Sequence, residues 1–558
     1  MDGSQRNYRG AGKGFVLFAA AYAVFAGVVA MLTQVGLPDT AAAILFLAVT
    51  LAAFITIALV ARTMDLPSFL ASARALPPGL NGMATAAAAI AGAGFLGLAG
   101  TFLSGESAGI AVIAGWALGF LALSILIAPF FRKSAAATVA EFLGIRYGSV
   151  EVRVVAVFVT LLASVILLIA ELAAAGLVAE RLLDLSPVTG IAIASVMAIA
   201  ASLFGGMQGV TLTGVAQYIV MAIAFVTPVA AISLQTYDLP LPHFTYGYAL
   251  EDIAALGGDA TAYSAGEFLP LGGLDGFNML VLALSLAAGI ASMPHIVMRS
   301  GAAASLGAAR RSGGWALLFV LLLAAAAPAY AAFARLATVA DSDVGPIDPS
   351  FLVLDFPVIA GLSSATTALL AIGALAALLA ASSAALFSIA VTIGHDLYAG
   401  LIDRRSAAGR RLIVTRIAIV AVAAFAALEA TRSTPKIFEL AVSALSLAAS
   451  GLFPAIVLGI WWKRATAWGA LAGMLAGFVA AAAYVVAVVG GGMEPWRPLG
   501  SAGTGLPAMA AAFFGLPAGF LTIIFVSQLT REPTDEQADL VDAIRRPSPS
   551  PLLDANRN

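Results

Sequence analysis

Residues 79–101, GLNGMATAAAAIAGAGFLGLAGT, decide the fold of this chain. The stretch is apolar and long enough to cross the hydrocarbon core of a bilayer at about 1.5 Å per residue. It is also unusually small-sided, with six glycines and no side chain larger than Thr over residues 84–89. We expect the helix to break near Ala91–Gly94 and face a cavity, because broken helices at membrane depth expose backbone groups that bind ions or solutes. A continuous, tightly packed helix without a site is the alternative.

The composition is that of an integral membrane protein. Of the 558 residues, 61% are hydrophobic and 10% are charged, which excludes a soluble globular chain. The chain has no cysteine, which excludes disulfide bonds and thiol chemistry. No nucleophile–base set or metal-ligand cluster is evident, so we expect neither an enzyme nor a nucleic-acid-binding protein. We also expect no cofactor beyond a coupling ion, Na+ or H+.

Apolar runs recur along the whole chain and predict an all-α protein with about fourteen transmembrane helices. An even number places both termini on one side of the membrane. If that side is the cytoplasm, 23 of the 28 Lys and Arg residues lie there, in agreement with the positive-inside rule. We therefore expect a multi-pass protein of a bacterial inner membrane, with both termini cytoplasmic. Whether a small membrane protein binds it as a partner is left open. The apolar runs lie near residues 14–34, 41–61, 79–104, 108–131, 152–180, 187–205, 211–236, 274–298, 313–338, 361–395, 412–429, 436–461, 467–490 and 506–528.

Glu171 is the clearest charged residue inside a predicted span. It lies past the midpoint of the run 152–180, with no adjacent base in the sequence. A charge at the bilayer centre costs about 2.5–3.5 kcal/mol on insertion scales, so such a carboxyl requires a physical reason. Binding of a proton or a cation is one reason, because desolvation penalises the free carboxylate. The alternatives are a structural carboxyl bonded to a neighbouring helix and a side chain that reaches the outer interface.

Two histidine-containing segments close predicted spans on the cytoplasmic side. Pro294 precedes His295 and Arg299 and suggests a kink or a helix end. We expect Arg299 to extend to the membrane interface, and His295 to be a structural or gating residue. His395 and Asp396 hold a similar place in the chain, and we expect a structural role for them as well.

Several stretches resemble the solute:sodium symporter family, and most of all its cation/acetate branch. The resemblance covers most of the chain, from about Ala61 to Gly473, and PHIVMR together with HDLY makes it specific. The stretches are NGMATAAAAIAGAGFLGLAG (81–100) for the first core helix, SLFGGMQGVTLTGVAQ (202–217) for the fifth, GIASMPHIVMRSGAAASLGAARRS (289–312) for the sixth, HDLYAG (395–400) for the eighth, and AASGLFPAIVLGIWWKRATAWGALAG (448–473) for the tenth.

The resemblance implies a leucine-transporter-type core of two inverted five-helix repeats, with two helices before it and two after it. Five spans per repeat is an odd number, which forces the second repeat to insert inverted. The implied organisation is an N-terminal two-helix segment (1–78), a first repeat (79–236), an external loop (237–273), a second repeat (274–461), two C-terminal helices (462–529) and a cytoplasmic tail (530–558).

The family's sodium site transfers only in part. Its hydroxyl ligands on the eighth core helix fall on alanines, and the acid on the fifth core helix falls on Gly214. Two mid-span hydroxyls follow those alanines, and they either bind a cation or bond to carbonyls one turn back. Because the sodium hydroxyls are missing, the membrane carboxyl of Glu171 is the candidate for proton coupling. The implied cation-binding positions are Ala87, Ile90, Ala377, Ala380 and Ala381, with Ser382 and Ser383 as the nearby hydroxyls.

These observations predict a cation-coupled secondary active symporter that imports a small monocarboxylate, such as acetate, by alternating access. A pocket that offers backbone N–H groups and a half-helix dipole suits a small carboxylate better than a sugar. The alternatives are a symporter for another small organic solute, such as an amino acid, and a membrane sensor that binds a solute without transporting it. The candidate solute-binding residues are Ala91, Gly92, Ala93, Gly94 and Phe95.

Overall fold

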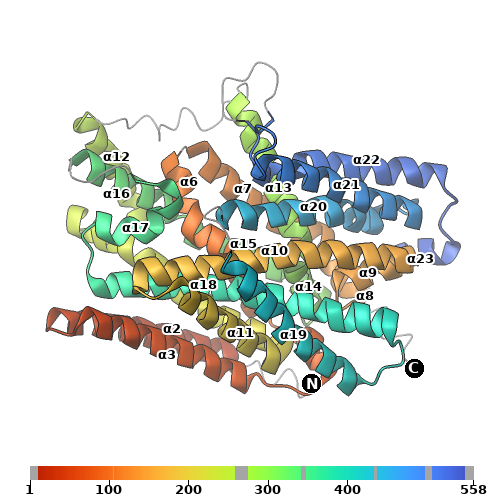
Figure 1. The fold of residues 1–558 in the computed structure, drawn as a ribbon, viewed down its shortest axis with the longest axis horizontal. Helices are drawn as coiled ribbons and strands as arrows, with labels where there is room; N and C mark the ends of the chain where they lie inside the picture. The colour runs from red at the N-terminus through yellow and green to blue at the C-terminus, as the bar shows by residue number, and fades with distance from the viewer. Residues whose placement is uncertain are drawn as a thin grey trace.

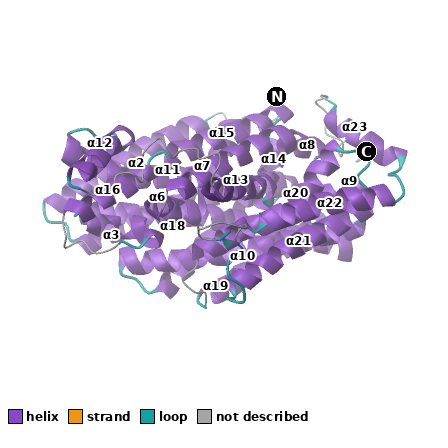
Figure 2. Ribbon diagram, turned by 90° about the horizontal axis from the view of Figure 1, so that it is seen from above, coloured by secondary structure: helices purple, strands orange, loops and turns teal. Residues whose placement is uncertain are grey.

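The structure is a computed structural model in which the chain forms helices joined by short loops (Figures 1 and 2). The residues that it describes form no β-sheet. Parts of the predicted external loop and of the predicted tail, residues 258–273 and 547–558, lie outside the description. The described ranges are 10–104, 106–257, 274–340, 347–432, 437–496 and 505–546.

Twelve described helices are long and apolar enough to cross a membrane, and a bent pair, 277–292 with 294–301, makes a thirteenth span. The 51-residue α11 (Pro187–Tyr237) would be about 76 Å long if straight, more than twice the hydrocarbon thickness. It is not straight, because Gly206 has φ +54° and ψ −135°. In a straight helix, residues 201 and 209 would lie about 12 Å apart along the axis. Here a Cβ on Gly209 would lie only 2.4 Å from the Ala201 carbonyl oxygen, so the chain turns back between them. α11 is therefore two helices that meet at Gly206, and the number of spans agrees with the fourteen expected.

The helices that make up these spans follow the predicted runs closely. In chain order they are α2 (Ala11–Gln34), α3 (Asp39–Val60), α5 (Pro78–Gly92) with η2 (Ala93–Gly97) and α6 (Leu98–Ser104), α7 (Glu106–Ala122) with η3 (Leu123–Ile127) and α8 (Ala128–Ser134), α10 (Val150–Leu183), α11, α13 (Leu274–Ser292) with α14 (Pro294–Gly301), α15 (Leu306–Ala324) with α16 (Ala327–Ala340), α18 (Ser364–Val391) with η7 (Thr392–Ile402), α19 (Ala408–Ala430), α20 (Ile437–Trp461), α21 (Ala467–Val489), and η8 (Ala508–Ala510) with α22 (Ala512–Leu529).

Helix α18 lies at the centre of the bundle. The most apolar window of its span is 100% buried, and that of the α5 span is 78% buried. The corresponding windows of α2 and α3 are 11% and 22% buried, so these two helices lie at the periphery, at the lower edge of Figure 1. Alanine and glycine dominate α18 and α5, which lets neighbouring helices approach closely.

Short helices mark the two ends of the bundle, and both views place them at opposite ends (Figures 1 and 2). One end carries α12, α16 and α17 and is called the α12 end; the other carries α9 and α23 and is called the α23 end. α23 is formed by the first part of the predicted tail. The short helices of the two ends are α9 (Val139–Tyr147), α12 (Pro242–Ala255), α17 (Leu352–Ile359) and α23 (Asp535–Arg545), and a further short helix, α4 (Leu66–Ala71), follows α3.

The first span of each predicted repeat is broken at a corresponding place. The first span breaks at Ala91, between α5 and the helix that continues through η2. The span made of α13 and α14 bends by 45° at Met293, directly before Pro294. Proline at this position cannot donate the hydrogen bond that would continue α13. Paired breaks in the two halves are the arrangement in which inverted-repeat transporters build a central binding site.

Gly206→Ala tests the turn inside α11. The backbone at Gly206 is in a region that only glycine adopts readily, and a Cβ there would lie 2.4 Å from the Phe69 carbonyl oxygen. We expect the substitution to lower the free energy of unfolding by about 2–5 kcal/mol through strain and overpacking. Thermal unfolding in detergent measures the effect. Gly314→Ala is the control, because a Cβ at Gly314 meets no atom within 4 Å; equal stability of the two variants would contradict the assignment of a turn.

Candidate functional site

The break expected near Ala91–Gly94 is confirmed at Ala91, which has φ +53° and ψ −170°. A residue with a side chain held in this region costs about 1–3 kcal/mol and persists only where its surroundings enforce it. The helix resumes at Gly92 and continues through η2 and α6. The break leaves backbone N–H groups at the start of this second half without helical partners.

Glu171 on α10 satisfies one of these groups. The Gly92 N–H donates to Glu171 Oε2 at 2.8 Å, and the Glu171 side chain is only 1% exposed. A carboxylate at a helix N-terminus gains from the helix dipole and from a charge-assisted hydrogen bond. No Lys, Arg or His forms an ion pair with Glu171 in the described part of the chain. The half-helix N-terminus is therefore the charge partner of this carboxyl.

Glycine at position 92 lets two side chains of neighbouring helices come close to the broken backbone. A Cβ there would lie 2.2 Å from Leu378 Cδ2 and 2.9 Å from Glu171 Oε2. Leu378 belongs to α18, so the break lies between α10 on one side and the central helix on the other. The small residues of the stretch thus allow two neighbouring helices to reach the broken backbone.

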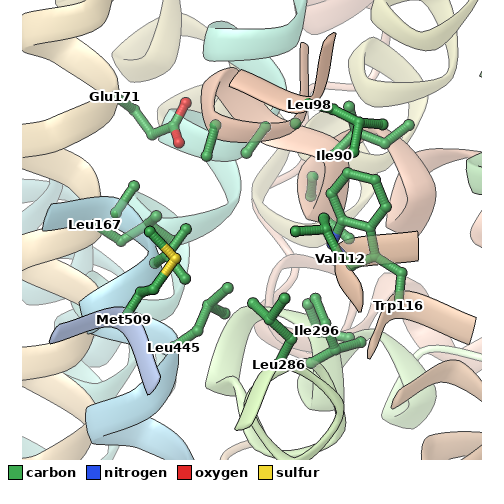
Figure 3. A pocket seen from close by; sticks show the side chains of 18 of the residues that line it. Ile90, Leu98, Val112, Trp116, Leu167, Glu171, Leu286, Ile296, Leu445 and Met509 are labelled. Atoms are coloured by element: carbon green, nitrogen blue, oxygen red, sulfur yellow. The ribbon is translucent and has the colours of Figure 1, made fainter. Parts of the chain in front are cut away.

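A pocket lies beside the break, and the space in it not filled by atoms is about 590 Å³, part of which is open to solvent. Figure 3 shows the Glu171 carboxyl on one side of it and the Trp116 indole on the other. Glu171 and His295 are the only ionisable side chains among the described residues that line it, and the rest of the wall is almost entirely apolar. The wall is made of Ala88, Ala89, Ile90, Ala91, Ala93, Gly94, Leu98, Val112, Trp116, Leu167, Glu171, Leu286, Ile290, His295, Ile296, Ala441, Val442, Leu445 and Met509.

The pocket adjoins a larger cavity of about 1390 Å³, part of which is open to solvent. The two share four lining residues, Ala93, Glu171, Ala441 and Met509. The larger cavity is also lined by residues 348–351, which lead into α17 at the α12 end. In this state, therefore, the pocket continues toward the α12 end, and Glu171 lies where the two cavities meet.

Ion pairs join helices at the opposite end. Asp396 Oδ1 lies 2.7 Å from Arg153 Nη2, and His395 Nε2 lies 3.1 Å from Glu141 Oε1. Burial alone would raise the pKa of Glu141, but the nearby charges of His395 and Arg153 and a backbone N–H lower this pKa to about 2. Glu141 therefore stays ionised at neutral pH. These pairs tie η7 to α9 and α10 and account for a structural role of His395 and Asp396.

The residues considered for a cation are all buried, on α5 and α18. Ile90 lines the pocket, whereas none of the α18 positions is among the described residues that line it. Ser383 Oγ donates to the Leu379 carbonyl at 2.6 Å, which is the bond one turn back that was the alternative to ion binding. Ser382 Oγ, fully buried, makes no hydrogen bond within the described residues. Ala87 and Ala377 are likewise fully buried, on α5 and α18.

The five residues considered for the solute separate into two groups. Ala91, Ala93 and Gly94 line the pocket, and Gly92 and Ala93 line the adjoining cavity. Phe95 lines neither cavity, and its ring lies 4.9 Å from that of Phe225 on α11. The break therefore brings together the backbone of residues 91–94, whereas Phe95 packs on the other side of the helix.

Three residues lie where the sequence did not lead us to expect them. The expectation that Arg299 reaches the membrane interface is wrong, because this residue is only 2% exposed. His295 lies in the pocket wall, with neither ring nitrogen making a hydrogen bond of good geometry in the described residues. Pro294 was the signal, since a helix that restarts there turns His295 inward. Met509 precedes α22 and reaches both cavities, and nothing in its sequence context pointed to this.

Comparisons with known proteins agree with this architecture. The sequence model of the sodium:solute symporter family matches residues 69–477. An uncharacterized symporter of Cupriavidus necator is 28% identical, with 90% of this chain and 93% of the relative covered. A monocarboxylic acid transporter of Corynebacterium glutamicum is 27% identical over 72% of this chain and 75% of the relative. A high-affinity proline transporter of Bacillus subtilis is 25% identical over 86% and 96%.

A solved structure shares the fold. It is a Na+-coupled sialic acid symporter in a substrate-bound, outward-open state, with a TM-score of 0.71 at 17% identity, covering 88% of this chain and 98% of that chain. The five-plus-five leucine-transporter-type core expected from the sequence is confirmed by this likeness. The matched family and the relatives are transporters and not enzymes.

Substitutions of Glu171 test its bond to the broken helix. The amide oxygen of Glu171→Gln can still accept the Gly92 N–H, whereas Glu171→Leu leaves that buried donor without an acceptor. We expect the Leu variant to be less stable than the Gln variant by about 1–3 kcal/mol. Thermal unfolding in detergent gives the difference, and Glu180→Leu, at an exposed position of the same helix, controls for added apolar surface. Equal stability of the Gln and Leu variants would mean that the bond contributes nothing.

Proposed function

The chain belongs to the sodium:solute symporter family, and we propose that it imports a small monocarboxylate, such as acetate, together with a proton by alternating access. The observation that carries this proposal is the hydrogen bond between the Gly92 N–H and Glu171. A carboxylate of the protein itself occupies the position that best suits an anion. A monocarboxylate that binds there must share that position with Glu171.

The shape and chemistry of the pocket support a small, mostly apolar solute. Its walls are Leu, Ile, Val, Met, Trp and Ala side chains, which suit a short alkyl group. Its polar groups are Glu171, His295 and the backbone at the break. A sugar would leave most of its hydroxyls without partners there, and buried unpaired polar groups are costly. The monocarboxylic acid transporter among the relatives supports the same class of solute.

Coupling to a proton follows from the repulsion between two carboxylates. Charges of the same sign a few ångströms apart in a water-poor site strongly disfavour each other. A proton on Glu171 removes this repulsion and lets the solute carboxylate approach the N-terminus of the half-helix. Proton and anion therefore favour each other's binding, which is the thermodynamic condition for coupling. A symport of one proton with one monocarboxylate also moves no net charge.

Sodium is the second candidate for the coupling ion. The family name and the Na+-coupled sialic acid symporter support sodium. The hydroxyl of Ser382, which has no hydrogen-bond partner among the described residues, is an oxygen that could bind a sodium ion. The alanines at 380 and 381, however, leave a sodium ion with few oxygen ligands, and a dehydrated cation needs several. The balance of these observations favours the proton.

An amino-acid-like solute is the second candidate for the cargo. The proline transporter among the relatives and the charge of Glu171 support it, because an ammonium group could pair with that carboxylate. Glu171→Gln should change the binding of the two solute classes differently. A solute with an ammonium group loses its charge partner and binds more weakly, whereas a monocarboxylate loses a competing carboxylate and still binds. The same substitution thus separates the two classes.

The distribution of charge suggests the orientation. Most Lys and Arg residues belong to segments of the α23 end, and the acid-rich stretch 237–273 connects to the α12 end. We place the α23 end and both termini in the cytoplasm of a bacterial inner membrane. The structure then represents a state whose pocket continues toward the outside.

Uptake into proteoliposomes with one gradient at a time tests the coupling ion. Pyruvate is a better probe than acetate, because its neutral acid is too scarce at neutral pH to cross lipid rapidly. With one pH unit, acid outside, we expect up to about tenfold accumulation, and none with a sodium gradient alone. Glu171→Gln should still exchange labelled for unlabelled pyruvate but should no longer accumulate it.

Protein-free vesicles correct for passive entry, and Glu180→Gln controls for removal of an exposed carboxyl from the same helix. Accumulation that depends on sodium and is unchanged in Glu171→Gln would overturn proton coupling. Absence of uptake and exchange under both gradients would favour the sensor alternative.

A further inference from the structure

Arg299 is a buried cation without a charged partner. Its side chain is only 2% exposed, and it forms no ion pair in the described part of the chain. Nη1 donates to Thr211 Oγ1 at 3.2 Å, while Nε and Nη2 have no hydrogen-bond partner there. A guanidinium has five N–H donors in a fork that matches a carboxylate, so this arrangement leaves a strong anion-binding group in the protein interior unused.

The hydrogen bonds of Arg299 to neighbouring residues fix its position, but they do not explain why a charged side chain is buried there. Asn81 Nδ2 donates to the Arg299 carbonyl oxygen at 3.0 Å, and this bond depends on the backbone only. Thr211 is itself a donor to the Met207 carbonyl and offers the guanidinium a neutral oxygen. Removing a full charge from water is expensive unless a counter-charge accompanies it. A mobile anion is the counter-charge that the described residues do not supply.

The position of Arg299 between the central pocket and the α23 end suggests a function for its charge. His295 lines both the central pocket and a small space around Arg299, which is closed in this state. That space is bordered by α11, α14 and α18 and contains the side chain of Ser388. α14 packs against α8 and α9, so Arg299 lies between the pocket and the α23 end.

We propose that Arg299 forms a second, inner binding position for a carboxylate, which the solute occupies on its way from the central pocket to the α23 end. This inference rests on the proposed function in that it takes the solute to be a small anion. The carboxylate leaves the half-helix N-terminus at Gly92, passes His295 and pairs with the free Nε and Nη2 of Arg299 when the inner half opens. Two positions of similar chemistry lower the cost of moving an anion through an apolar interior.

The absence of cysteine from the chain allows a direct test with single-cysteine variants. Ser388→Cys places a thiol in the space around Arg299. The full chain in proteoliposomes is treated with an anionic and a cationic methanethiosulfonate of similar size, and each rate is divided by the reagent's rate with a free thiol. We expect the anionic reagent to react about tenfold faster with the Ser388→Cys variant than the cationic one, because an uncompensated positive charge lies beside the thiol. Pyruvate should slow the anionic reagent.

Variants of Arg299 assign the preference to its charge. In an Arg299→Gln background the ratio of the two rates should fall to near one, and Arg299→Lys should retain most of it. Thr392→Cys, one turn further along the same helix and outside that space, should show a ratio that Arg299→Gln does not change. A ratio near one for Ser388→Cys, a ratio that persists in Arg299→Gln, or absence of modification in a variant that still transports would each overturn the inner site.

The outcome separates the inner site from the proposed function. If vesicles fail to take up monocarboxylates but the Ser388→Cys variant keeps an Arg299-dependent preference for the anionic reagent, the anion site stands and the proposed solute is wrong. If proton-coupled uptake is normal but the preference does not depend on Arg299, the function stands and the inner site is wrong.

Discussion

The architecture depends on one constraint: a helix that breaks inside a membrane must find partners for its freed backbone groups within the protein. The break at Ala91 places a side-chain-bearing residue in a strained conformation and frees the Gly92 N–H. Lipid offers no acceptor, so the partner must come from another helix. Glu171, 79 residues further along the chain, is that partner, and its burial is tolerable because the half-helix N-terminus is positive. The break and the buried carboxyl therefore stabilise each other.

This mutual dependence links the fold to the proposed transport cycle. The bond that satisfies the broken helix also occupies the most favourable place for an anionic solute, so the solute must displace or share it. In the proposed cycle, protonation of Glu171 weakens its interaction with the helix dipole when the solute replaces it. The apolar pocket wall strengthens this exchange, because electrostatic interactions are larger where water is scarce. A pocket with more polar walls would couple the two events less tightly.

Much of the fold could be predicted from the sequence, because hydropathy and glycine content report on individual helices. The spans, the break near Ala91–Gly94 and the buried carboxyl of Glu171 each left a local signal. What could not be predicted was the meeting of Glu171 with Gly92, since a contact between residues on different helices leaves no trace in either segment. Arg299 illustrates a second limit: a long basic side chain at the end of a span fits both a membrane anchor and a buried charge, and only packing separates them. The reach of Met509 into the pocket arises from the same kind of distant packing.

The central claim is that Glu171 takes up a proton when the solute anion binds. Calorimetric titration of the detergent-solubilised protein with pyruvate, repeated in buffers of different ionisation enthalpy, counts the protons taken up per solute bound. The account predicts about one proton for the wild-type chain and none for Glu171→Gln, with binding retained in both. Binding without proton uptake by the wild-type chain, or uptake that is unchanged in Glu171→Gln, would contradict it.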